Sequence, residues 1–274
     1  MKQDWIDFCL AMMTTPADQV SGARKIINNV VRTFTRIEDD LQILDAGYTG
    51  GKLNTLTKHY LVPESRDAVI PLWDKRVKQR KYGSVCFTCH GHITKTDPNK
   101  GSKRASVLTP CIQSMSLTLN EKEKTCEAHA FYRTTEVFKK FPADLVLIRD
   151  VLLPPFDFST IPLTKITFMF ANVTVHPMYF ATLAPNLDDP IKALERVQKH
   201  DPYFWLWCVK WTARYLIPEY HRGIQKYSQG MRVHEMFHRL IDPDICEELR
   251  EYVGDNHPGM RSEYIPPDEG NKDD

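Results

Sequence analysis

The stretch between Cys111 and Asp144 constrains the fold most, because it reads as strand, turn, strand and helix in succession. Residues 112–119 alternate apolar and polar side chains, which is typical of a strand with one buried face. The charged residues 121–124 predict a turn, and residues 127–150 predict a strand that passes into a helix ended by two prolines. This stretch therefore predicts a sheet covered by at least one helix.

Other segments add to this pattern. Residues 1–45 predict a mostly helical segment, because five apolar side chains recur at a spacing of three to four: Ile26, Ile27, Val30, Val31 and Phe34. Residues 68–73 and 167–175 each form a short apolar run that predicts a strand. From residue 189 onward the chain predicts helices that bury large side chains: Trp205, Leu206, Trp207, Trp211 and Leu216.

The bulk properties exclude some classes of protein. The chain has 274 residues with 42% hydrophobic residues, which suits one large domain or a domain with a helical appendage. A net charge of +1 argues neither for nor against a nucleic-acid partner. No 18-residue apolar run is present, so we expect no membrane span and no signal peptide. Seven cysteines, an odd number, predict reduced thiols in the cytoplasm, or in the host cytoplasm if the protein is viral.

Cys111 and Arg133 are the candidate residues for nucleophilic catalysis and phosphate binding. Cys111 follows a proline, and Arg133 and Thr134 come about twenty residues later, after the predicted turn. A nearby cation lowers the pKa of a thiol and so favours the nucleophilic thiolate. The planar fork of Arg133 also suits a phosphate, to which the Thr134 hydroxyl can add a donor. We therefore expect Cys111 and Arg133 on adjacent strands at one end of the sheet.

With Glu136 three residues after Arg133 and Asp144 eleven after it, the arrangement resembles the active-site core of the thymidylate synthase and deoxycytidylate hydroxymethylase superfamily. The resemblance covers roughly residues 63–180 and includes Arg66, which matches the first of two family arginines. It implies an α/β (α+β) fold, with a thymidylate-synthase-like sheet packed by helices and extra C-terminal helices.

The resemblance also implies a role for each residue of the motif. Cys111 is then the nucleophile that attacks C6 of a pyrimidine, which makes C5 nucleophilic. Glu136 orders water or the pterin, and Asp144 reads the base. The remaining roles are binding of phosphate by Arg133, Thr134 and, across a homodimer interface, Arg66, and binding of the sugar by His176 and Tyr179. The implied cofactor is 5,10-methylenetetrahydrofolate.

Asp144 indicates which pyrimidine nucleoside monophosphate is the substrate. Thymidylate synthases carry Asn at this position, whereas family members that act on cytosine carry Asp. A carboxylate accepts from the N4 amino group of cytosine but meets an acceptor, O4, in uracil. An unpaired group of this kind costs roughly 1–3 kcal/mol, which corresponds to a preference of roughly 10- to 100-fold. The sequence therefore predicts a (deoxy)cytidylate 5-hydroxymethyltransferase.

We expect four regions along the chain. Residues 1–62 form an N-terminal helical segment, and residues 63–185 form the catalytic core with a basic insertion at 74–107. Residues 186–260 form a C-terminal helical extension, and residues 261–274 form a disordered tail.

Several alternatives stay open. The insertion carries four residues that could hold a structural zinc: Cys86, Cys89, His90 and His92. The sequence CFTCH at 86–90 also matches a haem-attachment pattern, which we discount because export is not indicated. The sequence HEMFH at 234–238 matches a zinc metalloprotease helix, although the arginines flanking it would oppose a metal. A repurposed scaffold could bind a protein partner, or nucleic acid through the basic residues 75–104, although nucleic acid is not the expected partner.

Overall fold

The computed structural model describes residues 1–21, 23–37, 62–79, 82–89, 93–94, 106–107, 111–120, 122–138, 140–216 and 251. The chain divides into two compact units. The first comprises residues 1–8 and 27–174, and the second comprises residues 9–26 and the chain from 175 onward. Within the described residues, no helix is long and apolar enough to cross a membrane.

A six-stranded mixed sheet organises the fold. Its strand order is β1-β2-β8-β7-β6-β3, and its strands are β1 (Gln19–Ser21), β2 (Arg24–Phe34), β3 (Gly83–Thr88), β6 (Ile112–Asn120), β7 (Thr125–Glu136) and β8 (Leu163–Val175). The pair β7 and β8 is parallel, whereas β6 pairs antiparallel with both β3 and β7. A short hairpin of β4 (Ile93–Thr94) and β5 (Ser106–Val107) lies in the predicted insertion. This mixed sheet, packed with helices, confirms the α+β class.

The β6–β7 hairpin matches its prediction closely. Met115, Leu117 and Leu119 are buried on one face of β6, as the alternation indicated. The two strands run in register, with Leu117 opposite Ala128, and the turn contains Lys124 at a φ of 52°. Burial of one face fixes this register, since a slip by one residue would expose the apolar set.

A helical segment covers one face of the sheet in the first unit. It comprises α5 (Phe141–Leu147), which is buried throughout, and the π-helix η2 (Ile148–Leu152). The ring of Phe141 makes edge-to-face contacts with Tyr132 on β7 and with Phe168 and Phe170 on β8, at centroid distances of 5.9, 5.1 and 5.3 Å. Contacts of this kind add about 1 kcal/mol each beyond area burial, so they hold α5 against the centre of the sheet.

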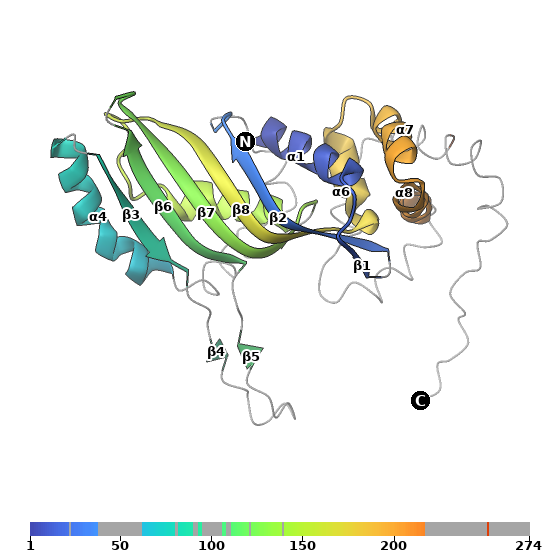
Figure 1. Cartoon of the computed structure of the whole chain (residues 1–274), viewed down its shortest axis with the longest axis horizontal. Coiled ribbons are helices and arrows are strands. Elements are labelled where there is room, and N and C mark those ends of the chain that lie inside the picture. Colours follow the sequence, from blue (N-terminus) through green and yellow to red (C-terminus); the bar gives the residue numbers. More distant parts are fainter. Residues whose placement is uncertain are drawn as a thin grey trace. The chain divides into compact units, whose positions relative to one another are not determined.

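The covering segment continues to the opposite edge of the sheet. Phe156, which follows η2, stacks on Phe87 of β3 at 5.9 Å and meets the edge of Trp73 at 6.0 Å. Trp73 belongs to α4 (Val62–Gln79), which lies alongside β3 (Figure 1). Gly83 at the start of β3 has no side chain because the Arg76 guanidinium passes there, 1.5 Å from where a Cβ would be.

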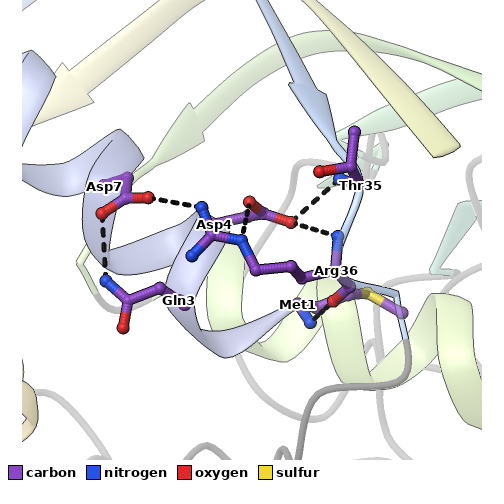
Figure 2. Close-up of polar contacts among 6 residues, drawn as sticks. All are labelled: Met1, Gln3, Asp4, Asp7, Thr35 and Arg36. Carbon is purple, nitrogen blue, oxygen red and sulfur yellow. Dashed lines mark hydrogen bonds and ion pairs between the residues drawn. The ribbon is translucent and has the colours of Figure 1, made fainter.

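The N-terminal helix α1 (Lys2–Thr14) is joined to the end of β2 by a polar network, shown in Figure 2. The Asp4 carboxylate accepts hydrogen bonds from the backbone N–H groups of Thr35 and Arg36, at 2.9 and 2.8 Å. The Arg36 guanidinium pairs with Asp4 and Asp7, and the Met1 amino group donates to the Arg36 carbonyl. Asp4 is buried, and these contacts satisfy its charge.

The second unit is largely helical. Its elements include η3 (Pro177–Tyr179), α6 (Phe180–Leu183), η4 (Ala184–Asn186), α7 (Pro190–His200) and α8 (Pro202–Leu216). The helices α7 and α8 confirm the helical prediction from residue 189 as far as residue 216. Asp201, between α7 and α8, pairs with the buried amino group of Lys25 at 2.9 Å. Lys25 also donates to the Met13 carbonyl and lies over the ring of Phe204.

Two predicted elements are wrong. Residues 24–34 form a strand rather than a helix. Asn29, with a φ of 54°, shifts the alternation of buried and exposed side chains by one residue, so that both Ile27 and Phe34 are buried. This shifted pattern resembles the spacing of a helix. Residues 68–73 lie within helix α4 rather than a strand, and the helix continues through Pro71. Tertiary packing of Trp73 overrides the local signal there.

The predicted strand at 167–175 is confirmed within β8. In α8 the large side chains divide, because Trp205 is buried whereas Leu206 is 38% exposed. The prediction that Leu206 is buried is therefore wrong. The expected disordered tail lies outside the described residues.

Candidate functional site

Cys111 and Arg133 lie side by side at one end of the sheet. Cys111 directly precedes β6, and its carbonyl accepts a hydrogen bond of 2.9 Å from the Arg133 N–H on β7. Cys111 is half-buried and Arg133 is exposed. The hairpin thus places the backbones of two residues that are far apart in sequence side by side, and the approach of their side chains stays a prediction.

The next residues of β7 continue toward the interior. Thr134 is half-buried, and Glu136 is 6% exposed at the last position of the strand. Glu136 is opposite Thr174 of β8, and its carbonyl accepts from the Lys140 N–H at the start of α5. The strand end and the following helix therefore form one continuous structure around this buried carboxyl group.

Asp144 is the most unusual residue of the group. It lies on α5 with 3% of its surface exposed, and its Oδ2 atom is buried without a hydrogen-bond partner. Burial raises the pKa of Asp144 from 3.8 to about 8, and the positive charge of Lys140 offsets only part of this effect. At neutral pH the Asp144 carboxyl is therefore mostly protonated, and its Oδ2 atom has no hydrogen-bond partner.

Cys89 is a buried thiol that the sequence predicted as a possible zinc ligand. It is buried at the end of β3, and its N–H donates to the Gln113 carbonyl at 2.9 Å, two residues from Cys111. Burial raises the pKa of the Cys89 thiol to about 12, with further contributions from the charges of Asp144 and Cys86. The alternation of β3 carries the signal, because Val85, Phe87 and Cys89 share the buried face.

The predicted zinc ligands do not form a shared site within the described residues. Cys86 is exposed and Cys89 is buried, so the two thiols lie on opposite faces of β3. No group of three metal-binding side chains occurs in the part of the chain that the structure describes. His90, His92 and the HEMFH segment at 234–238 lie outside it.

Arg66 is engaged within its own chain. It lies on α4, not on the expected strand, and its guanidinium donates to the Val151 carbonyl and pairs with Asp67 at 2.8 Å. Its side chain is 12% exposed. Binding of a partner's phosphate by Arg66 stays a prediction, and it would require these contacts to be exchanged.

The predicted sugar-binding residues belong to the second unit. His176 accepts a hydrogen bond at Nδ1 from the Met178 N–H, at 3.2 Å. The rings of His176 and Tyr179 are 5.3 Å apart, and both residues are half-buried. The two side chains thus lie together, and their role with a sugar stays a prediction.

No protein-family model matches the chain, and no curated protein matches it. Among solved structures, the chain is similar to thymidylate synthase from T4 phage, with 11% sequence identity and a TM-score of 0.39. The match covers 64% of this chain and 77% of the phage protein. The α+β class therefore rests on the strands and helices of the chain itself.

Proposed function

We propose that the chain is a pyrimidine nucleotide C5 one-carbon transferase and that its substrate is a (deoxy)cytidylate, converted to the 5-hydroxymethyl product. One observation carries this proposal. The residue at the base-reading position of the motif, Asp144, is a buried carboxyl group with an unpartnered oxygen. An unpartnered buried oxygen costs about 1–3 kcal/mol, which a hydrogen bond from a bound base would recover.

In the proposed reaction the Cys111 thiolate forms a bond to C6 of the base. The C5–C6 π electrons move to C5, which becomes the nucleophile for the one-carbon unit, and the C5 proton is then lost. Departure of the carrier from the transferred methylene group, addition of water to that group and expulsion of the thiolate then give the 5-hydroxymethyl product and restore the ring. Arg133, next to Cys111, favours the thiolate and binds the phosphate with Thr134.

A bound methylenetetrahydrofolate would supply the one-carbon unit. Glu136 would hold this group, because a buried carboxylate at the end of β7 can accept from the N–H groups of a pterin. The same carboxylate can instead order the water that the hydroxymethyl product requires.

The protonation state of Asp144 sets the choice of base. Once the thiolate has added and N3 carries a proton, cytosine presents N–H donors at both N3 and N4, and an ionised carboxylate accepts from both. Uracil in the same state accumulates negative charge on O4, which faces the carboxylate. Protonated Asp144 can donate to O4, so discrimination against uracil requires the ionised form. Because the Asp144 pKa is raised to about 8, we expect the preference for cytosine to increase as the pH rises through 8.

Release of tritium from C5-labelled dCMP, CMP and dUMP, with and without methylenetetrahydrofolate, tests the proposal. Thiolate addition alone makes the C5 proton labile, so release does not require the folate site. We expect release from a cytidylate that is lost in Cys111→Ala and retained in Cys86→Ala, because Cys86 is an exposed thiol on the edge strand β3. If the folded protein releases no tritium from any of these nucleotides, the proposed enzymatic activity is refuted.

The principal alternative is a scaffold without turnover that binds nucleic acid. One observation favours it, because Lys75 and Lys78 are exposed at the C-terminal end of α4. Salt-dependent binding of single- or double-stranded nucleic acid, together with no tritium release, would support this alternative.

A further inference from the structure

Val137 directly follows β7, and hydrogen bonds hold its backbone on both sides. Its N–H donates to the Thr174 carbonyl at 3.1 Å, which extends the pairing of β7 with β8 by one residue. Its carbonyl accepts a hydrogen bond of 2.8 Å from the indole Nε1–H of Trp5. The preceding residue is Glu136, the buried carboxyl group to which we assign the pterin or the reacting water. The position of Val137 therefore fixes the point from which the Glu136 side chain leaves the backbone.

Trp5 belongs to helix α1, 132 positions before Val137 in the sequence. Its side chain is buried, and a buried indole N–H requires an acceptor from the protein. Phe8, one turn further along the same helix, meets the ring of Phe141 at the start of α5 edge to face at 5.6 Å. Helix α1 therefore contacts both sides of the junction between β7 and α5, Val137 by a hydrogen bond and Phe141 by a ring contact.

The first turns of α1 are themselves held to the sheet. The Asp4 carboxylate accepts from the N–H groups of Thr35 and Arg36, which follow β2. The ring of Phe8 also stacks on Phe170 of β8 at 5.5 Å. Because these contacts fix the helix, Trp5 presents its N–H at a defined place beside the junction.

We propose that Trp5 is a positioning residue for Glu136: its indole N–H holds the Val137 carbonyl and so sets the place of the neighbouring carboxyl group in one-carbon transfer. Without this donor, the buried Val137 carbonyl would need another partner, and the junction would shift to find one. Small shifts of a catalytic group slow a reaction strongly. The inference rests on the proposed function for the role of Glu136. It gives the N-terminal helix, which lies outside the motif 111–144, a part in catalysis.

The ratio of hydroxymethylated nucleotide to released tritium, measured in one reaction of C5-labelled dCMP with methylenetetrahydrofolate, is the decisive measurement. Attack of Cys111 on C6 labilises the C5 proton without Glu136, whereas transfer requires Glu136. In Trp5→Phe we therefore expect the ratio to fall by about tenfold, the effect of one lost hydrogen bond, with the KM for dCMP changed by less than about twofold. The ratio does not depend on how much of the protein is folded. An unchanged ratio in Trp5→Phe would overturn the proposal.

Trp73→Phe is the matched control, because it makes the same chemical change at a second buried tryptophan. The Trp73 indole donates to the Asp157 carbonyl at 3.5 Å rather than to the junction between β7 and α5. This variant should leave the ratio unchanged, and an equal fall would refute a specific role for Trp5. If Trp5→Phe does not fold, benzothienylalanine at position 5 keeps the shape of the ring and replaces only the N–H by sulfur. A wild-type ratio in that protein would also refute the proposal.

Amide hydrogen exchange tests the hold on Val137 without any reaction. The N–H groups of Val137 and Lys140 donate to the carbonyls of Thr174 and Glu136, so both amides report on the junction. In Trp5→Phe they should exchange about tenfold faster than in the wild type, relative to the amides of the β6–β7 hairpin. A wild type without tritium release would refute the proposed function, while faster exchange would still support the hold of Trp5 on Val137. Tritium release with unchanged exchange and an unchanged ratio would instead refute the role of Trp5 alone.

Discussion

Replacement of Asp144 by asparagine should change the pH dependence of stability in a way that the structure allows us to calculate. The pKa of Asp144 is raised from 3.8 to about 8, so the folded state binds more protons than the unfolded state between these values. The free energy of unfolding of the wild-type protein therefore decreases as the pH rises from about 4 and levels off above about 8. Four units correspond to about 6 kcal/mol at most.

The Asp144→Asn substitution would remove this dependence because an amide does not ionise in this range. The buried amide leaves a polar group unpaired, at a cost of about 1–3 kcal/mol. We therefore expect Asp144→Asn to be less stable than the wild type near pH 4 and more stable, by about 3 kcal/mol or more, at pH 9. All other groups titrate alike in the two proteins, so their contributions cancel in the difference between the two free energies of unfolding.

Equilibrium urea unfolding at pH 4.5, 7 and 9, followed by circular dichroism, measures this difference. Asp188→Asn is the control, since it removes the same formal charge at an exposed position and should show no comparable crossing of the two curves. A stability difference between Asp144→Asn and wild type that does not change with pH would refute the raised pKa. It would also remove the physical basis for pH-dependent base selection.

Three further substitutions test the packing around the site and in the second unit by the same unfolding assay. Gly83→Ala should cost about 1 kcal/mol, because its Cβ displaces the Arg76 guanidinium, and the cost should disappear in an Arg76→Ala background. Lys25→Met should cost about 2 kcal/mol by leaving the partly exposed Asp201 without its partner, and Asp201→Asn should recover part of this loss. Asp4→Asn should cost about 2 kcal/mol, since the Asp4 carboxylate accepts two backbone N–H groups; a neutral effect would contradict the network in Figure 2.

The central hairpin could be predicted because its signal is local. Leu117 and Leu119 are buried on one face of β6, and the following turn is short, so alternation alone fixes strand, turn and partner strand. The approach of Cys111 to Arg133 follows directly from that pairing. Spacing along two adjacent strands is therefore enough to predict which of these residues meet.

Strand β2 and helix α4 could not be predicted by the same means. A single left-handed residue, Asn29, shifts the alternation of β2 by one, so its apolar residues imitate the spacing of a helix. In α4, Pro71 suggests a break that does not occur, because Trp73 is buried against Phe156 and Phe158 and holds the helix in place. Both errors arise where one residue departs from the rule of its element.

The position of Cys89 shows why a sequence motif alone can assign a residue to the wrong site. In the sequence, Cys89 stands three residues from Cys86, a spacing that indicates a metal site. In a strand, however, residues three apart face opposite sides, and β3 places Cys86 outside and Cys89 inside. The register of β3 on β6 places Cys89 on the buried face, where its N–H donates to the Gln113 carbonyl. Burial rather than metal binding then controls the Cys89 thiol, because burial raises its pKa to about 12.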